Sequence, residues 1–148
     1  MKLSFTRLGQ NDALILLTDF NRYFVPALSE RDIELEAYAV KLSHYGYFIL
    51  VQANSDDFFG GYDGFIAYYL NPDSHFAYIS LICVKTACQH KGIGYIMLEK
   101  LVLSLGPEYE KLMLEVRKDN YQGLKFYLRN GFIEKEDRGE KVLMEKRL

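Results

Sequence analysis

The stretch CQHKGIGYIMLEK, residues 88–100, places two glycines one residue apart behind a polar, basic turn. The apolar residues that follow recur at helical spacing as far as Gly106-Pro107, so a helix is predicted over residues 92–105. The preceding segment, residues 75–85, is the longest predicted strand and is apolar on both faces, as in the middle of a helix-covered sheet. A glycine turn between such a strand and a helix exposes backbone N–H groups that bind anions. The stretch therefore predicts a phosphate site, and a turn that needs only flexible glycines is the alternative.

Two familiar phosphate loops do not fit this stretch. A Walker loop requires Gly-Lys followed by Ser or Thr, whereas Lys91 precedes Gly92. A dinucleotide fingerprint requires a third glycine where Met97 stands, and it comes early in a fold rather than after several strands. The predicted phosphate site is therefore of another kind.

The composition is that of an ordinary globular chain. It has 148 residues, 49% of them hydrophobic, and a formal net charge of −2, so we expect one domain over residues 1–148. This balance argues against a disordered chain and against nucleic acid as a partner. No apolar run reaches the roughly 18 residues of a membrane span, and no signal-peptide core is present. Cys83 and Cys88 are too few for a disulfide framework or a metal site, which favours a reducing cytoplasm.

Strand and helix patterns alternate along the chain and predict an α/β (α+β) fold. The first helix is expected to be capped by Asn11 or Asp12, and the second by Ser29 with Asp32 three residues on. Strands are predicted at residues 3–8, 47–52, 64–70, 75–85, 111–116 and in two C-terminal segments, and helices at 12–20, 30–44, 92–105 and 121–130.

Two motifs resemble those of one protein family. Residues 89–94, QHKGIG, match the Q/R-x-x-G-x-G/A loop of the GNAT superfamily of N-acetyltransferases, and residues 120–132, NYQGLKFYLRNGF, are similar to its N-x-x-A-x-x-F/L-Y-x-x-x-G-F signature. The resemblance is sharp over residues 77–132. It implies the acyl-CoA N-acyltransferase fold, a mixed, mostly antiparallel sheet of six to seven strands with helices on both faces. Acetyl-coenzyme A, the co-substrate, would lie between two splayed central parallel strands.

The resemblance also implies which residues bind the cofactor. Backbone groups of the loop would hold the pyrophosphate, the end of the preceding strand would pair with the pantetheine arm, and the helix that Asn120 caps would face the cofactor. Gly123 stands where the family usually has Ala, and it is still small enough for close approach. The implied cofactor-binding residues are Ile82, Cys83, Val84, Gln89, His90, Lys91, Gly92, Ile93, Gly94, Asn120, Gly123 and Tyr127.

Acetyl transfer to an amine needs a base, a group that polarises the thioester carbonyl, and an acid. Tyr127 is the candidate acid, because it follows Asn120 by about two helical turns and shares its face; a buried core tyrosine is the alternative. Glu115 is the candidate base, since its spacing to Asn120 and Tyr127 resembles the ribosomal-protein alanine acetyltransferases. The alternatives are a carboxylate that binds a cationic acceptor or pairs with a lysine, and a water that acts as the base.

The acceptor is the least determined part of the prediction. Residues 24–32 and 38–42 resemble small bacterial acetyltransferases that accompany surface-polysaccharide genes, which implies a small-molecule amine such as an amino sugar. A protein N-terminus is the alternative acceptor, and a non-catalytic acyl-coenzyme A binding module is the alternative function. The chain is expected to be a monomer or a homodimer. The candidate acceptor-side residues are Tyr23, Phe24, Asp56, Asp57, Tyr62, Tyr78 and Ser80.

Overall fold

The computed structural model describes residues 1–52 and 61–148. Its sheet has seven strands in the order β1-β2-β3-β4-β5-β7-β6. The predicted fold class is confirmed, including the strand number and the helices. The elements are β1 (Leu3–Thr6), α1 (Gln10–Phe20), α2 (Leu35–Tyr45), β2 (Tyr47–Gln52), β3 (Tyr62–Asn71), β4 (Phe76–Val84), α3 (Ile93–Ser104), β5 (Lys111–Arg117), α4 (Tyr121–Arg129), β6 (Ile133–Arg138) and β7 (Lys141–Arg147).

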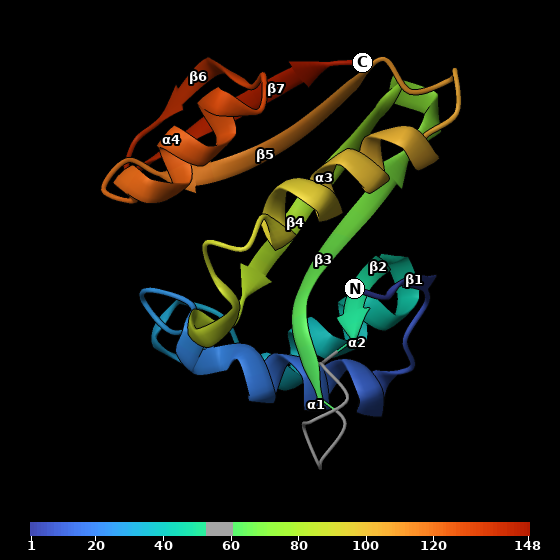
Figure 1. The fold of residues 1–148 in the computed structure, drawn as a ribbon, viewed down its shortest axis with the longest axis vertical. Coiled ribbons are helices and arrows are strands. Elements are labelled where there is room, and N and C mark those ends of the chain that lie inside the picture. The colour runs from blue at the N-terminus through green and yellow to red at the C-terminus, as the bar shows by residue number, and fades with distance from the viewer. Residues whose placement is uncertain (53–60) are drawn as a thin grey trace.

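The pairing of β4 with β5 is parallel, and every other neighbouring pair in the sheet is antiparallel. The parallel ladder runs only from the pair Phe76 and Lys111 to the pair Ile79 and Leu114. Beyond that point β4 continues to Val84 and β5 to Arg117 while the two strands diverge (Figure 1). The sheet is therefore split open at the carboxyl ends of its two central strands.

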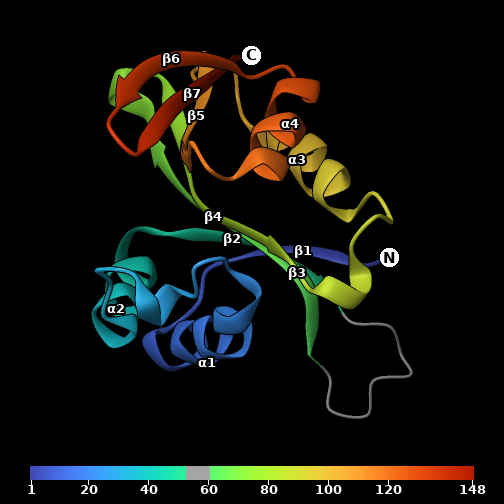
Figure 2. The ribbon, with the colours of Figure 1, turned by 90° about the vertical axis from the view of Figure 1, so that its left-hand side faces the viewer.

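Helices cover both faces of the sheet (Figure 2). The first core cluster lies between the sheet and α3 and α4, with Met97 and Leu101 fully buried. The second lies between the sheet and α1 and α2, where Phe20 packs edge-on against Phe65 of β3 with ring centroids 4.8 Å apart. Within the described ranges no helix is long and apolar enough to cross a membrane.

A β-bulge in β4 changes which core its side chains enter. Tyr68 pairs with Ile79 and Ala67 with Leu81, so Ser80 is an extra residue in β4. Before the bulge Ile79 belongs to the α3/α4 core, and after it Leu81 belongs to the α1/α2 core. The strand that sequence patterning describes as apolar on both faces thus supplies both cores, at a point next to the split in the sheet.

Two predicted helix caps are wrong. The N-cap of α1 is Gly9 rather than Asn11 or Asp12, and it makes no side-chain cap bond. α2 begins only at Leu35, after Glu34 as N-cap. Ser29 lies in the 3-10 turn Leu28–Glu30, where its N–H donates to the side chain of Asn21 at 2.8 Å. A polar residue that bonds to a distant side chain is not available to start a helix, and sequence spacing does not reveal that bond.

The N-terminus of α4 is capped as predicted. Asn120 accepts a hydrogen bond through its side chain from the N–H of Gly123 at 3.0 Å. A Cβ built on Gly123 would lie 2.6 Å from Asn120 Nδ2 and 2.9 Å from its Cγ. Glycine at this position therefore leaves room for the side chain of Asn120 in the conformation that it adopts here.

We predict that Gly123→Ala and Asn120→Ala are strongly coupled in stability. In the native background, the roughly 1 kcal/mol gained in helix propensity is offset by a lost cap of about 1 kcal/mol, so the net change is small. In the Asn120→Ala background the obstructing side chain is gone, and Gly123→Ala should stabilise the fold by about 1 kcal/mol. Urea unfolding of the four proteins measures both effects. Equal effects of Gly123→Ala in the two backgrounds would contradict the steric explanation.

Candidate active site

The split between β4 and β5 leaves backbone groups of β4 without a strand partner. The N–H of Lys85 donates to the carbonyl of Asp63 in β3 at 2.8 Å. Since bonded and non-bonded pairs alternate in an antiparallel ladder, the backbone groups of Ile82 and Val84 point away from β3 and toward the split. Cys83, two residues before Lys85, directs its backbone groups toward its partner Phe65 in β3. Ile82 and Val84 are therefore the strand residues that offer backbone bonds to a bound molecule.

The loop between β4 and α3 has an unusual backbone. His90 and Gly92 have φ values of 63° and 77°, in the left-handed region. Left-handed residues within a turn direct successive N–H groups into one concavity that binds anions, and the positive end of the α3 dipole adds to it. Gln89 fixes the loop to the strand, because its Nε2 donates to the Val84 carbonyl at 3.2 Å. A Cβ on Gly92 would meet no atom within 4 Å, so the concavity is open there.

At two residues of this loop, the side chain or its absence serves packing between helices and core. Ile93 is buried in the α3/α4 core. A Cβ on Gly94 would lie 3.2 Å from the ring of Phe126, so the missing side chain of Gly94 lets α3 approach α4. Their backbone N–H groups still lie in the first turn of α3, where no intrahelical acceptor is available. His90 and Lys91 are exposed beside them.

Tyr127 projects from α4 into the core beside the end of β4. It is 8% exposed, and its ring packs edge-on against Phe132 with centroids 5.6 Å apart. Burial, with the nearby Cys83 thiol as a smaller contribution, raises the pKa of the Tyr127 hydroxyl above its usual value. Among the hydrogen bonds of the described residues, none involves this hydroxyl. Tyr127 is thus protonated at neutral pH and has a hydroxyl available for another molecule.

Glu115 lies on the opposite face of the sheet from Tyr127. Its neighbours Leu114 and Val116 enter the α3/α4 core, which turns Glu115 toward the layer of α1 and α2. Tyr78 of β4 donates to Glu115 Oε1 at 3.1 Å across the beginning of the split. Arg138 Nη1 lies 3.7 Å from Glu115 Oε2. Burial, followed by the carboxylate of Glu115, raises the pKa of Tyr78, so Tyr78 remains a donor to that carboxylate.

Sequence reasoning missed Tyr38 and Arg138 in this region. The Tyr38 hydroxyl of α2 contacts that of Ser80 at the bulge, and burial raises the pKa of Tyr38. Tyr38 shares the apolar spacing of its helix, which gives no sign of this contact, and Arg138 lies in a hairpin far along the chain. Of the candidate acceptor-side residues, Tyr78 and Ser80 face this region, whereas Asp56 and Asp57 lie outside the described residues.

The remaining aromatic candidates pack against the protein. Phe24 lies against Phe65 with centroids 6.3 Å apart, and Tyr23 against Phe20 at 5.9 Å. Tyr62 packs on the α1/α2 core.

The two cysteines enter different cores. Cys83 is buried in the α1/α2 core, and Cys88 packs against the α3/α4 core. Both are free thiols. Burial raises the pKa of Cys83 to about 12, so it carries no thiolate at neutral pH. In the described part of the chain, no three His, Cys, Asp or Glu side chains are grouped closely enough to hold a metal ion.

The geometry is thus a split parallel strand pair, with a loop of left-handed residues and a helix N-terminus at the end of one strand and a carboxylate on the other. The model of the acetyltransferase (GNAT) family matches residues 14–132. The chain belongs to this family. As a member of this family, the protein is an acetyltransferase that uses acetyl-coenzyme A as the acetyl donor. The alternative function, a non-catalytic acyl-coenzyme A binding module, is not supported. Curated protein sequences gave no match.

Solved structures of acetyltransferases share the fold. The PaiA N-acetyltransferase of Thermoplasma acidophilum, in complex with coenzyme A, is 21% identical with a TM-score of 0.70 over 100% of both chains. The ribosomal-protein-S18-alanine N-acetyltransferase of Escherichia coli is 18% identical, with a TM-score of 0.72 over 99% of this chain and 94% of that one. Arabidopsis thaliana NAA60, in complex with a bisubstrate analogue, is 15% identical, with a TM-score of 0.75 over 99% and 98%. At these identities the likeness concerns the fold.

Proposed function

We propose that the enzyme transfers the acetyl group of acetyl-coenzyme A directly to a primary amine of a small molecule, such as an amino sugar, within a ternary complex. The observation that carries this proposal is the position of Glu115 and Tyr127 on opposite faces of the sheet, at the split between β4 and β5. Direct transfer needs a base that reaches the amine and an acid that reaches the departing sulfur, and these two residues would approach the reacting groups from the two sides of the split.

The residues of the split fit acetyl-coenzyme A, which supplies an activated thioester when bound. The N–H groups of residues 90–94 would bind the pyrophosphate, because a Cβ on Gly92 would meet no protein atom within 4 Å. Gln89 would hold the loop in place through its side chain, since its own N–H donates to the Thr86 carbonyl at 3.3 Å. Ile82 would offer its N–H and C=O to the pantetheine arm, and Val84 its N–H, because the Val84 carbonyl is bonded to Gln89. Asn120 and Gly123 would line the helix side. Cys83 would not bind the pantetheine arm, since its backbone pairs with β3 and its side chain enters the α1/α2 core.

Glu115 and Tyr127 would move the protons. Glu115 would take a proton from the acceptor amine, directly or through water, with Tyr78 and Arg138 holding its carboxylate in place. Tyr127 would donate a hydrogen bond from Oη toward the departing sulfur. Its raised pKa keeps this proton on the oxygen throughout the neutral range. A covalent route through Cys83 is disfavoured, because its thiol is buried and protonated.

The acceptor side supports a compact acceptor. The connection between α1 and α2 packs onto the sheet through Phe24 and the fully buried Leu28, so it covers this face. An extended polypeptide would need this face open. The protein N-terminus remains the second candidate, favoured by the resemblance at Glu115 and Tyr127. We further propose a bacterial cytoplasmic location, which two free thiols and the resemblance of residues 24–32 support.

An acceptor screen tests the proposal. Release of free coenzyme A thiol is measured with amino sugars, aminoglycosides, polyamines and peptides with free N-termini. Transfer to small amines with little transfer to peptides is the expected result, and the reverse order would favour the second candidate. Failure to acetylate any amine would overturn the proposal.

We predict that a negative charge at Gly92, rather than a side chain as such, weakens cofactor binding. Asp and Asn have nearly the same shape, and both tolerate a positive φ better than most residues. Gly92→Asn should retain binding of acetyl-coenzyme A, whereas Gly92→Asp places a carboxylate beside the pyrophosphate and should weaken binding by at least about tenfold. Calorimetric titration of both variants measures the difference. Equal affinities would show that the pyrophosphate binds elsewhere.

We predict that Tyr127→Phe lowers turnover by about 100- to 10,000-fold, as expected for loss of a catalytic acid. The ring and its packing remain, so acetyl-coenzyme A should still bind. Tyr68→Phe, a buried tyrosine of the same core on β3, is the control and should change turnover little. Steady-state rates with a saturating acceptor measure both. Unchanged turnover in Tyr127→Phe would assign Tyr127 to packing alone.

We predict that Glu115→Gln lowers turnover most at low pH. The acceptor amine is mostly protonated there, so a base is needed, whereas at high pH the amine loses its proton in solution and activity partly recovers. Glu136→Gln is a matched control, since Glu136 Oε2 contacts the same arginine, Arg138, at 3.3 Å. The pH dependence of kcat distinguishes the roles. A change in KM alone, with parallel pH profiles, would make Glu115 an acceptor-binding residue.

A further inference from the structure

Arg31 lies above the acceptor side of the split, in the connection between α1 and α2. Phe65 of β3 pairs with Cys83 near the end of β4, and Phe24 packs on the ring of Phe65. The Arg31 guanidinium lies over Phe24, 5.5 Å from the ring centroid. Arg31 thus lies over Phe24, which packs edge-on against Phe65, the cross-strand neighbour of Cys83 near the end of β4.

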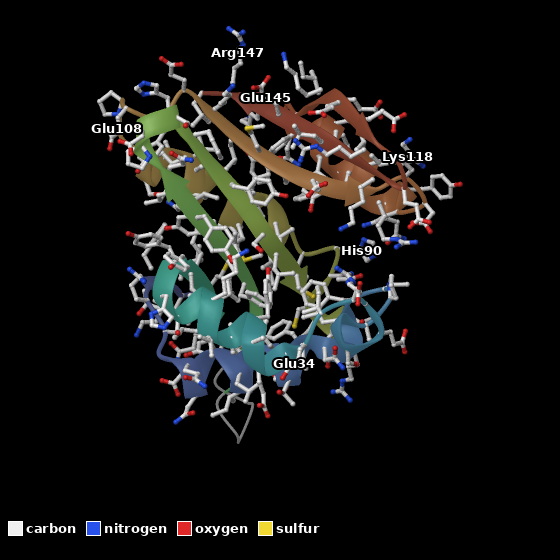
Figure 3. The ribbon with its side chains drawn as sticks, turned by 180° about the vertical axis from the view of Figure 1, so that it is seen from behind. Glu34, His90, Glu108, Lys118, Glu145 and Arg147 are labelled. Carbon is white, nitrogen blue, oxygen red and sulfur yellow. The ribbon has the colours of Figure 1, made fainter. Side chains whose placement is uncertain are left out.

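Further contacts fix the position of this guanidinium. Arg31 Nε donates to the carbonyl of Pro26 at 3.0 Å in a partly buried bond. Tyr38 and Cys83 lie within its electrostatic reach, and Tyr38 contacts Ser80 at the bulge of β4. Figure 3 views this face with α2, which begins after Glu34, in front of the sheet, and shows His90 and Lys118 where β4 and β5 are far apart. Arg31 is therefore held on the α1/α2 face of the sheet, the face toward which Glu115 points.

Arg31 differs from the other two arginines near the opening in having no anionic partner among the described residues. Arg117 binds Asp119 with two hydrogen bonds, at 3.1 and 3.2 Å, and Arg138 contacts Glu115 and Glu136. Arg31 takes part in none of the ion pairs within residues 1–52 and 61–148, and only its Nε is engaged in a hydrogen bond there. Burial, with Arg117 as a smaller cause, lowers the pKa of Arg31, so an anion beside it would be favourable.

We infer that the acceptor is a zwitterion, whose amine is directed to Glu115 and whose carboxylate or phosphate binds the Nη groups of Arg31. This inference rests on the proposed function and adds the second charge of the acceptor. A planar guanidinium presents paired donors that match both kinds of anion. Opposite charges at Glu115 and Arg31 would orient the acceptor so that its amine, and no other group, lies by the base.

Matched acceptor pairs test the inference. Glucosamine and its 6-phosphate differ by a phosphate, and alaninamide and alanine differ by a carboxylate. The wild-type enzyme should prefer the anionic member of at least one pair by about tenfold or more in kcat/KM, and the preferred pair identifies the anion. In Arg31→Gln this preference should fall to about one, chiefly through KM. Arg22→Gln is the control, because Arg22 of the same connection is exposed and donates to Tyr23 at 2.9 Å.

The possible outcomes separate this inference from the proposed function. Transfer to amines with equal kcat/KM within both pairs, or a preference that Arg31→Gln leaves unchanged, would overturn the role of Arg31 while transfer itself stands. If no amine is acetylated, the role of Arg31 is decided by titrating inorganic phosphate into the coenzyme A complex at constant ionic strength, monitored by protein NMR. Binding to the wild type that is lost in Arg31→Gln supports the anion site, and identical binding overturns it.

Discussion

The short parallel ladder between β4 and β5 is the constraint on which the site depends. It ends at Ile79 and Leu114, and beyond it each strand keeps only its outer neighbour. Backbone N–H and C=O groups that lack a strand partner need other hydrogen-bond partners. The inner edge of β4 is therefore open to hydrogen bonds from another molecule. The bulge at Ser80 lies next to this point. The side chains of β4 therefore switch from one core to the other where the strand loses β5 as its partner.

Much of the fold was predictable from local patterns. Strand and helix positions followed from apolar periodicity, and the two motifs around Gly92 and Asn120 indicated the family, because backbone conformation and capping are encoded within a few residues. The second helix start was not predictable, since Ser29 bonds to Asn21 instead of capping. Likewise, the packing reason for a glycine at position 94 was not predictable, because the ring that a side chain would meet, that of Phe126, belongs to another helix.

The candidate site likewise contains residues that the sequence indicates and residues that only the packing reveals. Glu115 and Tyr127 were identifiable because motif spacing places them on known elements. Tyr38 and Arg138 were not, since their contacts with Ser80 and Glu115 depend on how α2 and the β6–β7 hairpin pack against the sheet. Arg31 was not predictable either, because a charged residue in a connecting segment carries no sequence pattern that indicates a site. Its position follows from the contact of its guanidinium with the ring of Phe24.

The split sheet also has a mechanical consequence. The part formed by β1 to β4 carries Tyr78 and the loop that leads to α3, and the part formed by β5, β7 and β6 carries Glu115 and Arg138. Among the described residues, the ladder that ends at Ile79 and Leu114 is what joins the two parts of the sheet. The angle between β4 and β5 at this ladder determines how far apart the two strands lie beyond it, and their separation grows with distance from it. The packing around Ile79 and Leu114 therefore sets the width of the opening farther along the two strands.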